Sequence, residues 1–299
     1  IARVTLTDGL DGDLHEFQLT DDGTALVLAY EPREADLTEV DGPEDGWVLD
    51  NHVQEIDIET GEVLFDWRAL GNVPFTDSYR ELVADAATSE DERDEDGSEE
   101  LPMDWFHVNS VEDDGDAFLV SARNTHAVYR ILKESGEIDW ILNGKSSDFE
   151  MGEGTVFAWQ HDARRQDDGT ITILDNAANP PVADRSRGIR LDVDPEAGTA
   201  TLVTEYAHPD DVLAGSQANM QVLDNGNVVM GWGSEGRVTE FTAEGEIVFD
   251  ATWAPADSYR VYRMPWVGEP TDPPDVVAES AGDAVDVHVS WNGATEVAS

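Results

Sequence analysis

The stretch HVNSVEDDG, residues 107–115, decides the fold because its skeleton recurs along the chain. HEFQLTDDG at 15–23 and HDARRQDDG at 161–169 share the same pattern, His-x5-Asp-Asp-Gly. A fourth copy, QANMQVLDNG at 217–226, carries Ala218 in the histidine position and Asn-Gly at the turn. Asp-Gly or Asn-Gly between two alternating apolar runs is the strongest short-range hairpin signal. Each copy therefore predicts a β-hairpin.

A second hairpin follows each of these four. The second hairpins are predicted at 52–67, 127–142, 187–206 and 237–253. The repeating unit is therefore four strands, and four-stranded units repeated around an axis are the blades of a β-propeller. We expect an all-β protein with about four blades visible. The innermost strands should begin at 14–20, 106–112, 160–166 and 217–223 and line the central axis.

The propeller is expected to occupy residues 1–268, with further N-terminal blades missing before Ile1. GEPTDPPDVV (268–277) has the composition of a linker, so residues 269–299 are expected to hold a linker and the start of a new β element. The one predicted helix lies within 78–100 and runs into an acidic loop.

The charge balance is extreme. The chain has 66 acidic and 17 basic residues, a net charge of −49, and the acidic residues are spread over nearly every loop. Such a chain repels itself unless salt screens it, which predicts a protein of a halophile. A dedicated binder of cations or basic partners is the alternative. Nucleic acid is excluded as a partner, since phosphate binding needs a basic patch.

Two absences bound the class of protein further. There is no cysteine, so disulfides and thiolate sites are excluded. No apolar run reaches the ~18 residues of a membrane-spanning helix, and no signal peptide is present. The chain begins at Ile1, so a targeting segment removed from it or lying outside it is compatible with the sequence.

Three histidines are the candidate functional residues. Superposition of the repeats puts His15, His107 and His161 at the same place, the channel end of an innermost strand, from which they would converge on one pocket. The alternative is that they only pack the blades. Converging imidazoles can bind a metal or perform covalent catalysis. Arg123, at the far end of the following strand, favours an oxyanion, because its planar fork of donors suits phosphate or sulfate.

The other histidines lie outside the repeat pattern and are expected to be structural or exposed. These are His52, His126, His208 and His288.

Five segments together resemble the arylsulfotransferase (ASST) family. They are DWFHVNSV…FLVSARNTHAVYRI (104–131), WQHDARR…GTITILDN (159–176), SQANMQVLDNGNVVMGWGS (216–234), SYRVYRMPWVG (258–268) and SWNGATEVAS (290–299). The similarity begins at LHEFQLTDDGTALVLAY and covers almost the whole chain. It is closest to the soluble or anchored branch shared by archaea, actinobacteria and fungi, and with the acidic composition it indicates a haloarchaeal-type member.

The resemblance implies a six-bladed propeller followed by an immunoglobulin-like β module, of which residues 269–299 would be the beginning. It implies transfer of a sulfuryl group from a phenolic sulfate ester to a phenol through a sulfohistidine, without the nucleotide donor PAPS. By the resemblance His161 is the nucleophile, and His107 binds sulfuryl oxygens or protonates the leaving phenol. Arg123 clamps the sulfuryl oxygens, and His15 is the remaining channel histidine.

Small molecules are the expected partners: an aryl sulfate donor and a phenolic acceptor, with no cofactor and no catalytic metal. Trp105, Phe106 and Trp159 flank the histidines and are expected to stack on the aromatic substrate. The resemblance also implies an extracytoplasmic or surface-anchored protein, with any membrane anchor outside this chain. Two alternatives stay open, a non-catalytic propeller that serves as a binding or scaffold module and a metal-dependent hydrolase using the three histidines.

Overall fold

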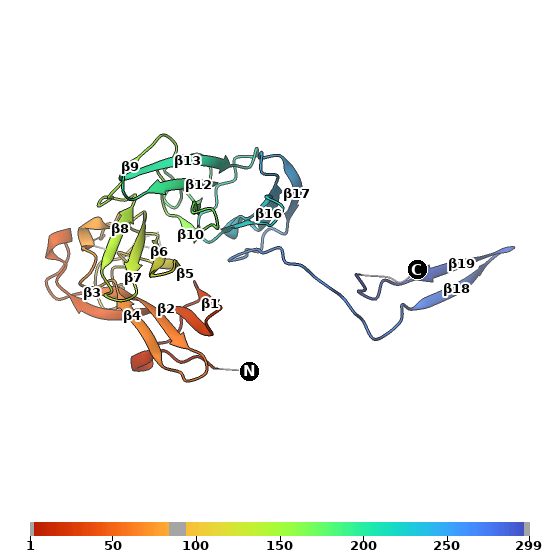
Figure 1. Cartoon of the computed structure of the whole chain (residues 1–299), viewed down its shortest axis with the longest axis horizontal. Helices are drawn as coiled ribbons and strands as arrows, with labels where there is room; N and C mark the ends of the chain where they lie inside the picture. Colours follow the sequence, from red (N-terminus) through yellow and green to blue (C-terminus); the bar gives the residue numbers. More distant parts are fainter. Residues whose placement is uncertain (1–2, 84–93, 296–299) are drawn as a thin grey trace. The chain divides into compact units, whose positions relative to one another are not determined.

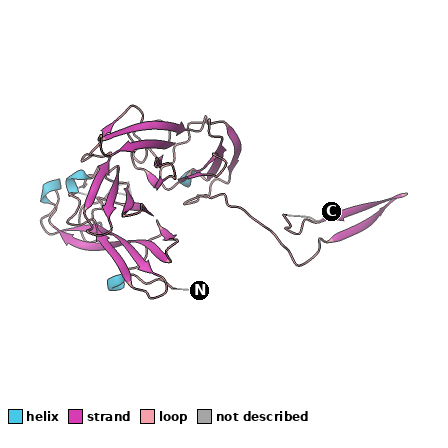
Figure 2. Ribbon diagram, in the orientation of Figure 1, coloured by secondary structure: helices cyan, strands magenta, loops and turns pink. Residues whose placement is uncertain are grey.

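The computed structural model describes residues 3–83 and 94–295. Within these residues the regular structure is almost entirely β-strand, and the only helices are single 3₁₀ turns (Figure 2). These turns are η1 (Thr7–Gly9), η2 (Thr38–Val40), η3 (Phe75–Asp77) and η5 (Gly233–Glu235). Residues 78–83 and 94–100 contain no helix, so the helix predicted over 78–100 is absent from its described ends, and residues 84–93 lie outside the described part.

Four antiparallel sheets follow one another along the chain (Figure 1). The first contains β1 (Phe17–Leu19), β2 (Thr24–Ala35), β3 (Gly46–Asp57) and β4 (Val63–Arg68). The second contains β5 (Val108–Asp113), β6 (Ala117–Ala122), β7 (Ala127–Leu132) and β8 (Ile138–Leu142). The third contains β10 (His161–Arg165), β11 (Ile171–Asp175), β12 (Arg187–Asp194) and β13 (Thr199–Tyr206), with β9 (Glu150–Met151) added in parallel at its edge. The fourth contains β14 (Asn219–Val222), β15 (Val228–Gly231), β16 (Arg237–Phe241) and β17 (Ile247–Thr252).

In each sheet the four strands pair in chain order, which is the topology of a propeller blade. All four predicted units are present, and the prediction of an all-β propeller architecture is confirmed. The first blade differs from the prediction in one respect: β2 and β3 pair with each other over twelve residues each, so β3 begins at Gly46 and not at His52.

The repeated turn explains the repeated glycine. Gly23, Gly115, Gly169 and Gly226 all have φ between 77° and 87°, the left-handed region that glycine tolerates best. A Cβ on Gly23, Gly115 or Gly169 would meet no atom within 4 Å, so the backbone conformation and not the available space requires glycine there.

The blades pack on one another through alternating side chains. In β6, Phe118 and Val120 belong to the apolar cluster shared with the first blade, whereas Leu119, between them, belongs to the cluster shared with the third. Successive side chains of a strand point to opposite faces, so a strand covered on both sides is apolar throughout. A third cluster joins the third and fourth blades, where Leu174 meets Met220 and Met230.

Residues Tyr262–Ser299 form a second unit, separate from Ile1–Val261. Its described part contains one exposed hairpin of β18 (Val276–Ala281) and β19 (Ala284–Val289). The compact unit thus ends at Val261, seven residues before the predicted boundary at 268. That the hairpin begins an immunoglobulin-like module stays a prediction.

Candidate active site

The four residues predicted as catalytic line one cavity of about 650 Å³. His15 lies two residues before β1, His107 directly precedes β5, His161 begins β10, and Arg123 directly follows β6. The prediction that the three histidines converge on a common cavity is confirmed. The three rings differ in what each one contacts.

The backbone at the starts of these strands is unusual. His107, Trp159, Asp162, Gln217 and Ala218 all have positive φ, between 55° and 88°, although none is glycine. Both β5 and β10 also shift register within their first residues. Such strained positions and bulges re-aim side chains and cluster at functional sites.

His161 is held as a neutral imidazole with a defined tautomer. Its Nδ1 lies 2.8 Å from Asn176 Oδ1, and Asn176 Nδ2 donates to the carbonyls of Ala214 and Gln217 at 3.0 Å each. These two bonds orient the amide, so its oxygen faces the ring and Nδ1 must carry the proton. Burial, and secondarily the charge of Arg123, holds the pKa of His161 well below its usual value. Nε2 therefore carries a lone pair.

His15 and His107 have anionic partners instead. Nδ1 of His15 contacts Asp13 Oδ1, and Nδ1 of His107 contacts Asp104 Oδ2. The two rings meet edge to face with centroids 5.0 Å apart. Burial lowers the pKa of His107, although the charge and hydrogen bond of Asp104 act in the opposite direction. A carboxylate on Nδ1 stabilises the protonated ring, which an amide cannot do to the same extent.

Arg123 is fixed above an aromatic ring. Its guanidinium carbon lies 4.8 Å from the centroid of Trp159, Nη1 donates to Asn124 Oδ1 at 2.9 Å, and Nη2 points to Asn179 O at 3.4 Å. A guanidinium stacked and tethered in this way loses little side-chain entropy when it binds an oxyanion.

A buried ionic network lies directly beside the histidines in sequence. Glu16 accepts from Arg260 Nη1 at 2.7 Å and from Arg164 Nη2 at 2.6 Å. Asp162 accepts from Arg164 Nε at 3.0 Å, and its other oxygen accepts the N–H of Met220 at 3.0 Å. The network therefore ties together the first, third and fourth blades at the strand ends that carry the cavity.

The family is decided by the sequence as a whole. The family model described as Arylsulfotransferase (ASST) matches residues 7–254, more than four fifths of the chain. The chain belongs to the arylsulfotransferase family. None of the curated proteins compared with this ASST-family chain matches it.

Solved structures resemble the chain only weakly. A protein of unknown function from Bacteroides caccae is 16% identical, with a TM-score of 0.43 over 79% of this chain and 65% of its own. Virginiamycin B lyase from Staphylococcus aureus is 11% identical, with a TM-score of 0.40 over 80% of this chain and 55% of its own. Sqt1 from Saccharomyces cerevisiae is 11% identical, with a TM-score of 0.39 over 90% of this chain and 69% of its own. The ASST-family chain thus spans less than two thirds of the first two structures, and its fold rests on its own sheet topology.

The prediction that Trp105, Phe106 and Trp159 stack on substrate is wrong. Trp105 and Phe106 are fully buried in the apolar cluster between the first two blades, and neither lines the cavity. Trp159 is also buried. Arg123 lies over its ring, and the ring of His126 meets it edge to face with centroids 4.3 Å apart. Proximity in sequence to His107 and His161 misled the prediction, because adjacent side chains leave the backbone in different directions.

The sequence did not identify the other residues that line the cavity, among them Tyr259, Arg80 and Glu95. Tyr259 lies in the SYRVYRMPWVG segment, whose family resemblance was the available signal. Burial, followed by the charge of Asp104, raises the pKa of Glu95 to about 7. Arg80 pairs with Glu95 at 3.6 Å. Their segment carries no repeat pattern, so nothing local marked them.

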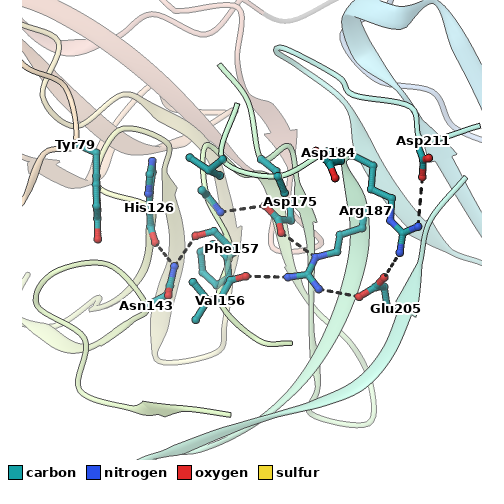
Figure 3. A pocket seen from close by; sticks show the side chains of 15 residues that line it. Tyr79, His126, Asn143, Val156, Phe157, Asp175, Asp184, Arg187, Glu205 and Asp211 are labelled. Carbon is teal, nitrogen blue, oxygen red and sulfur yellow. Dashed lines mark hydrogen bonds and ion pairs between the residues drawn. The ribbon is translucent and has the colours of Figure 1, made fainter. Parts of the chain in front are cut away.

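A second cavity, of about 740 Å³, is lined by a different set of residues, among them Asn143, Asp175 and Glu205 (Figure 3). His126 lines it and stacks on Tyr79 with ring centroids 3.9 Å apart. Burial, then the charges of Arg123 and Lys145, lowers the pKa of His126 to about 3, so this ring is neutral. Both arginines that line this cavity, Arg185 and Arg187, are paired with carboxylates.

Of the remaining histidines, His52 and His208 are buried and His288 is exposed. Across residues 3–83 and 94–295, no group of three or more His, Asp or Glu side chains is arranged to hold a metal ion. In the same ranges no helix is long and apolar enough to span a membrane.

Proposed function

We propose that this chain is an aryl-sulfate sulfotransferase that works without PAPS and carries the sulfuryl group on His161. One observation carries the proposal: the three cavity histidines differ in the partner of Nδ1. His161 has a neutral amide partner, whereas His15 and His107 have carboxylates. The same residue type is thereby prepared for two tasks, nucleophilic attack and proton transfer.

In the first half-reaction, Nε2 of His161 attacks the sulfur of an aryl sulfate. The N–S bond forms as the S–O bond to the aryl group breaks. The departing phenolate takes a proton from the imidazolium of His107 and leaves as a phenol. Arg123 donates to the sulfuryl oxygens throughout, and a donor aimed at developing charge is among the strongest catalytic effects.

In the second half-reaction a new phenol enters the same cavity. It gives its proton to the now neutral His107 and attacks the sulfur, and the N–S bond breaks. Atoms and charge balance over the cycle, and no nucleotide is consumed. The anionic substrate itself favours the protonated form of His107, because a nearby negative charge raises the pKa of an imidazole.

His15 completes the donor set. Its ring lies edge to face against His107, and its Nδ1 is occupied by Asp13. In the proposed reaction it stabilises the charge on the sulfuryl oxygens beside Arg123. A metal-dependent hydrolysis finds no support in this arrangement, since the guanidinium of Arg123 would repel a cation held by these rings.

The test is a burst experiment on the full chain in molar KCl. Incubation with p-nitrophenyl sulfate and no acceptor should release at most one equivalent of nitrophenol and leave one sulfuryl group on His161, detected by mass spectrometry of peptides. His161→Ala should lose both the burst and the label.

His208→Asn is the matched control, because His208 and His161 are equally buried, at 3% exposure, but His208 does not line the cavity. This variant should label normally. A wild-type chain that neither turns over nor labels would support the non-catalytic scaffold instead. Normal labelling of His161→Ala would show that the nucleophile is another residue.

Localisation is proposed from the family alone. We place the protein outside the cytoplasm or anchored at the cell surface. Cell fractionation with an antibody against the chain would test this, and recovery only in the cytoplasm would contradict it.

A further inference from the structure

The fourth repeat lacks its histidine, and another segment fills the place. Ala218 occupies the histidine position, and its N–H donates to the carbonyl of Tyr259 at 3.0 Å. Asn219 then bonds both backbone groups of Val261, at 2.8 and 2.9 Å. Residues 258–261 therefore cross the start of β14. A Cβ on Gly231 would lie 2.6 Å from Asn219 Oδ1 and 3.0 Å from Val261, so the sheet is shaped to admit this segment.

The side chain of Tyr259 lies among the histidines. It lines the cavity, and its ring centroid is 5.5 Å from that of His15 and 6.4 Å from that of His161. The hydroxyl is buried, and no residue in the described part of the chain is its hydrogen-bond partner. A buried hydroxyl without a partner is uncommon in proteins and calls for a ligand or another explanation.

Tyr30, the other tyrosine beside these histidines, has a hydroxyl that does form a hydrogen bond. Its ring also contacts His15 and His107, with centroids 5.7 and 5.8 Å apart, yet it does not line the cavity. Its hydroxyl donates to the carbonyl of Val108. The hydroxyl of Tyr30 is therefore bonded within the fold, whereas the hydroxyl of Tyr259 lies at the cavity without a partner among the described residues.

We propose that Tyr259 is a further catalytic residue, whose hydroxyl donates a hydrogen bond to an oxygen of the bound sulfuryl group in place of the imidazole that the fourth repeat lacks. This role rests on the proposed sulfuryl transfer. The next residue fixes the backbone position of Tyr259, because Arg260 donates two hydrogen bonds to the buried carboxylate of Glu16.

The charge state of Tyr259 suits a donor. Burial raises the pKa of its hydroxyl far above the ordinary value, with Glu16, Asp162 and Asp13 acting in the same direction and Arg260 against it. The group therefore stays protonated and neutral near neutral pH. It can donate a hydrogen bond to an anion but cannot act as a base.

The two tyrosines provide a paired experiment with inorganic sulfate as the probe. Tyr259→Phe should weaken sulfate binding, measured by calorimetry at constant high KCl, by about tenfold or more, as expected for one hydrogen bond to a charged group. Its melting temperature without sulfate should stay the same or rise, because no described residue bonds the hydroxyl that is removed. Tyr30→Phe should show the reverse: unchanged sulfate affinity and a lower melting temperature.

The outcomes separate the two proposals. If wild type binds sulfate and labels His161 but Tyr259→Phe binds sulfate equally well, the role of Tyr259 is overturned and the proposed function stands. If wild type neither binds sulfate nor labels, the sulfuryl site itself is overturned, and Tyr259 with it. A loss of affinity confined to Tyr259→Phe, with labelling of His161 slowed but still complete, supports both.

Discussion

Glu16 provides the sharpest test of how the site is held. The substitution Glu16→Gln keeps the shape of the side chain and removes one buried negative charge that two arginines share. Glu16 is 4% exposed and is bound by Arg164 and Arg260 at 2.6–3.1 Å. Breaking a buried ion pair on one side leaves an uncompensated charge and typically costs about 3–5 kcal/mol.

Asp168→Asn is the matched control. Asp168 lies at the same 2.6 Å from its arginine, Arg190, but its side chain is 57% exposed. Exposed pairs contribute only about 0–1 kcal/mol. Both substitutions remove one negative charge, so their effect on the overall repulsion of the chain is the same and cancels in the comparison.

Thermal melts in molar KCl measure the difference. At roughly 2–4 °C per kcal/mol for a domain of this size, Glu16→Gln should lower the melting temperature by about 6–20 °C and Asp168→Asn by about 4 °C at most. Glu16→Gln should also weaken sulfate binding, because Glu16 follows His15 and holds Arg260 beside Tyr259. Equal shifts for the two variants would refute the view that burial, and not distance, makes this network strong.

Three further predictions concern protonation and salt. With His107 as the proton donor, kcat/KM should fall as pH rises through a pKa lower than that of an ordinary histidine, and His107→Gln should remove this limb. Asn176→Asp places a carboxylate at Nδ1 of His161 and raises the pKa of that ring. The variant should therefore lose kcat/KM at low pH, where its His161 becomes protonated, and the wild type should not. An unchanged pH profile in the variant would contradict the role of the amide. The melting temperature should rise with KCl concentration into the molar range, because the chain has a net charge of −49 and repels itself. Salt screens this repulsion strongly only when the Debye length falls to a few ångströms, at ~1 M. A melting temperature that does not change with KCl would remove the inference of a halophilic protein.

The sequence by itself determined the blades and the residues at their inner ends. Hairpin signals and strand alternation are local, so Asp-Asp-Gly or Asp-Asn-Gly turns between alternating runs located all four sheets of the propeller unit. The repeat also carried long-range information, because equivalent positions in equivalent blades must meet at the axis. That is why His15, His107 and His161 were placed together although 146 residues separate the first from the last.

Only the tertiary structure decided what each side chain contacts there. Asn176 is a neutral amide whereas Asp13 and Asp104 are carboxylates, and only the packing shows which of them faces which ring. Tyr259 reaches the cavity from outside the repeat, across the small Ala218, and no local pattern encodes such an approach. Trp105 is fully buried in the core, although it is only two residues from His107 in the sequence. Periodicity specifies the face of a strand, whereas partners, protonation and access depend on contacts between residues far apart in the chain.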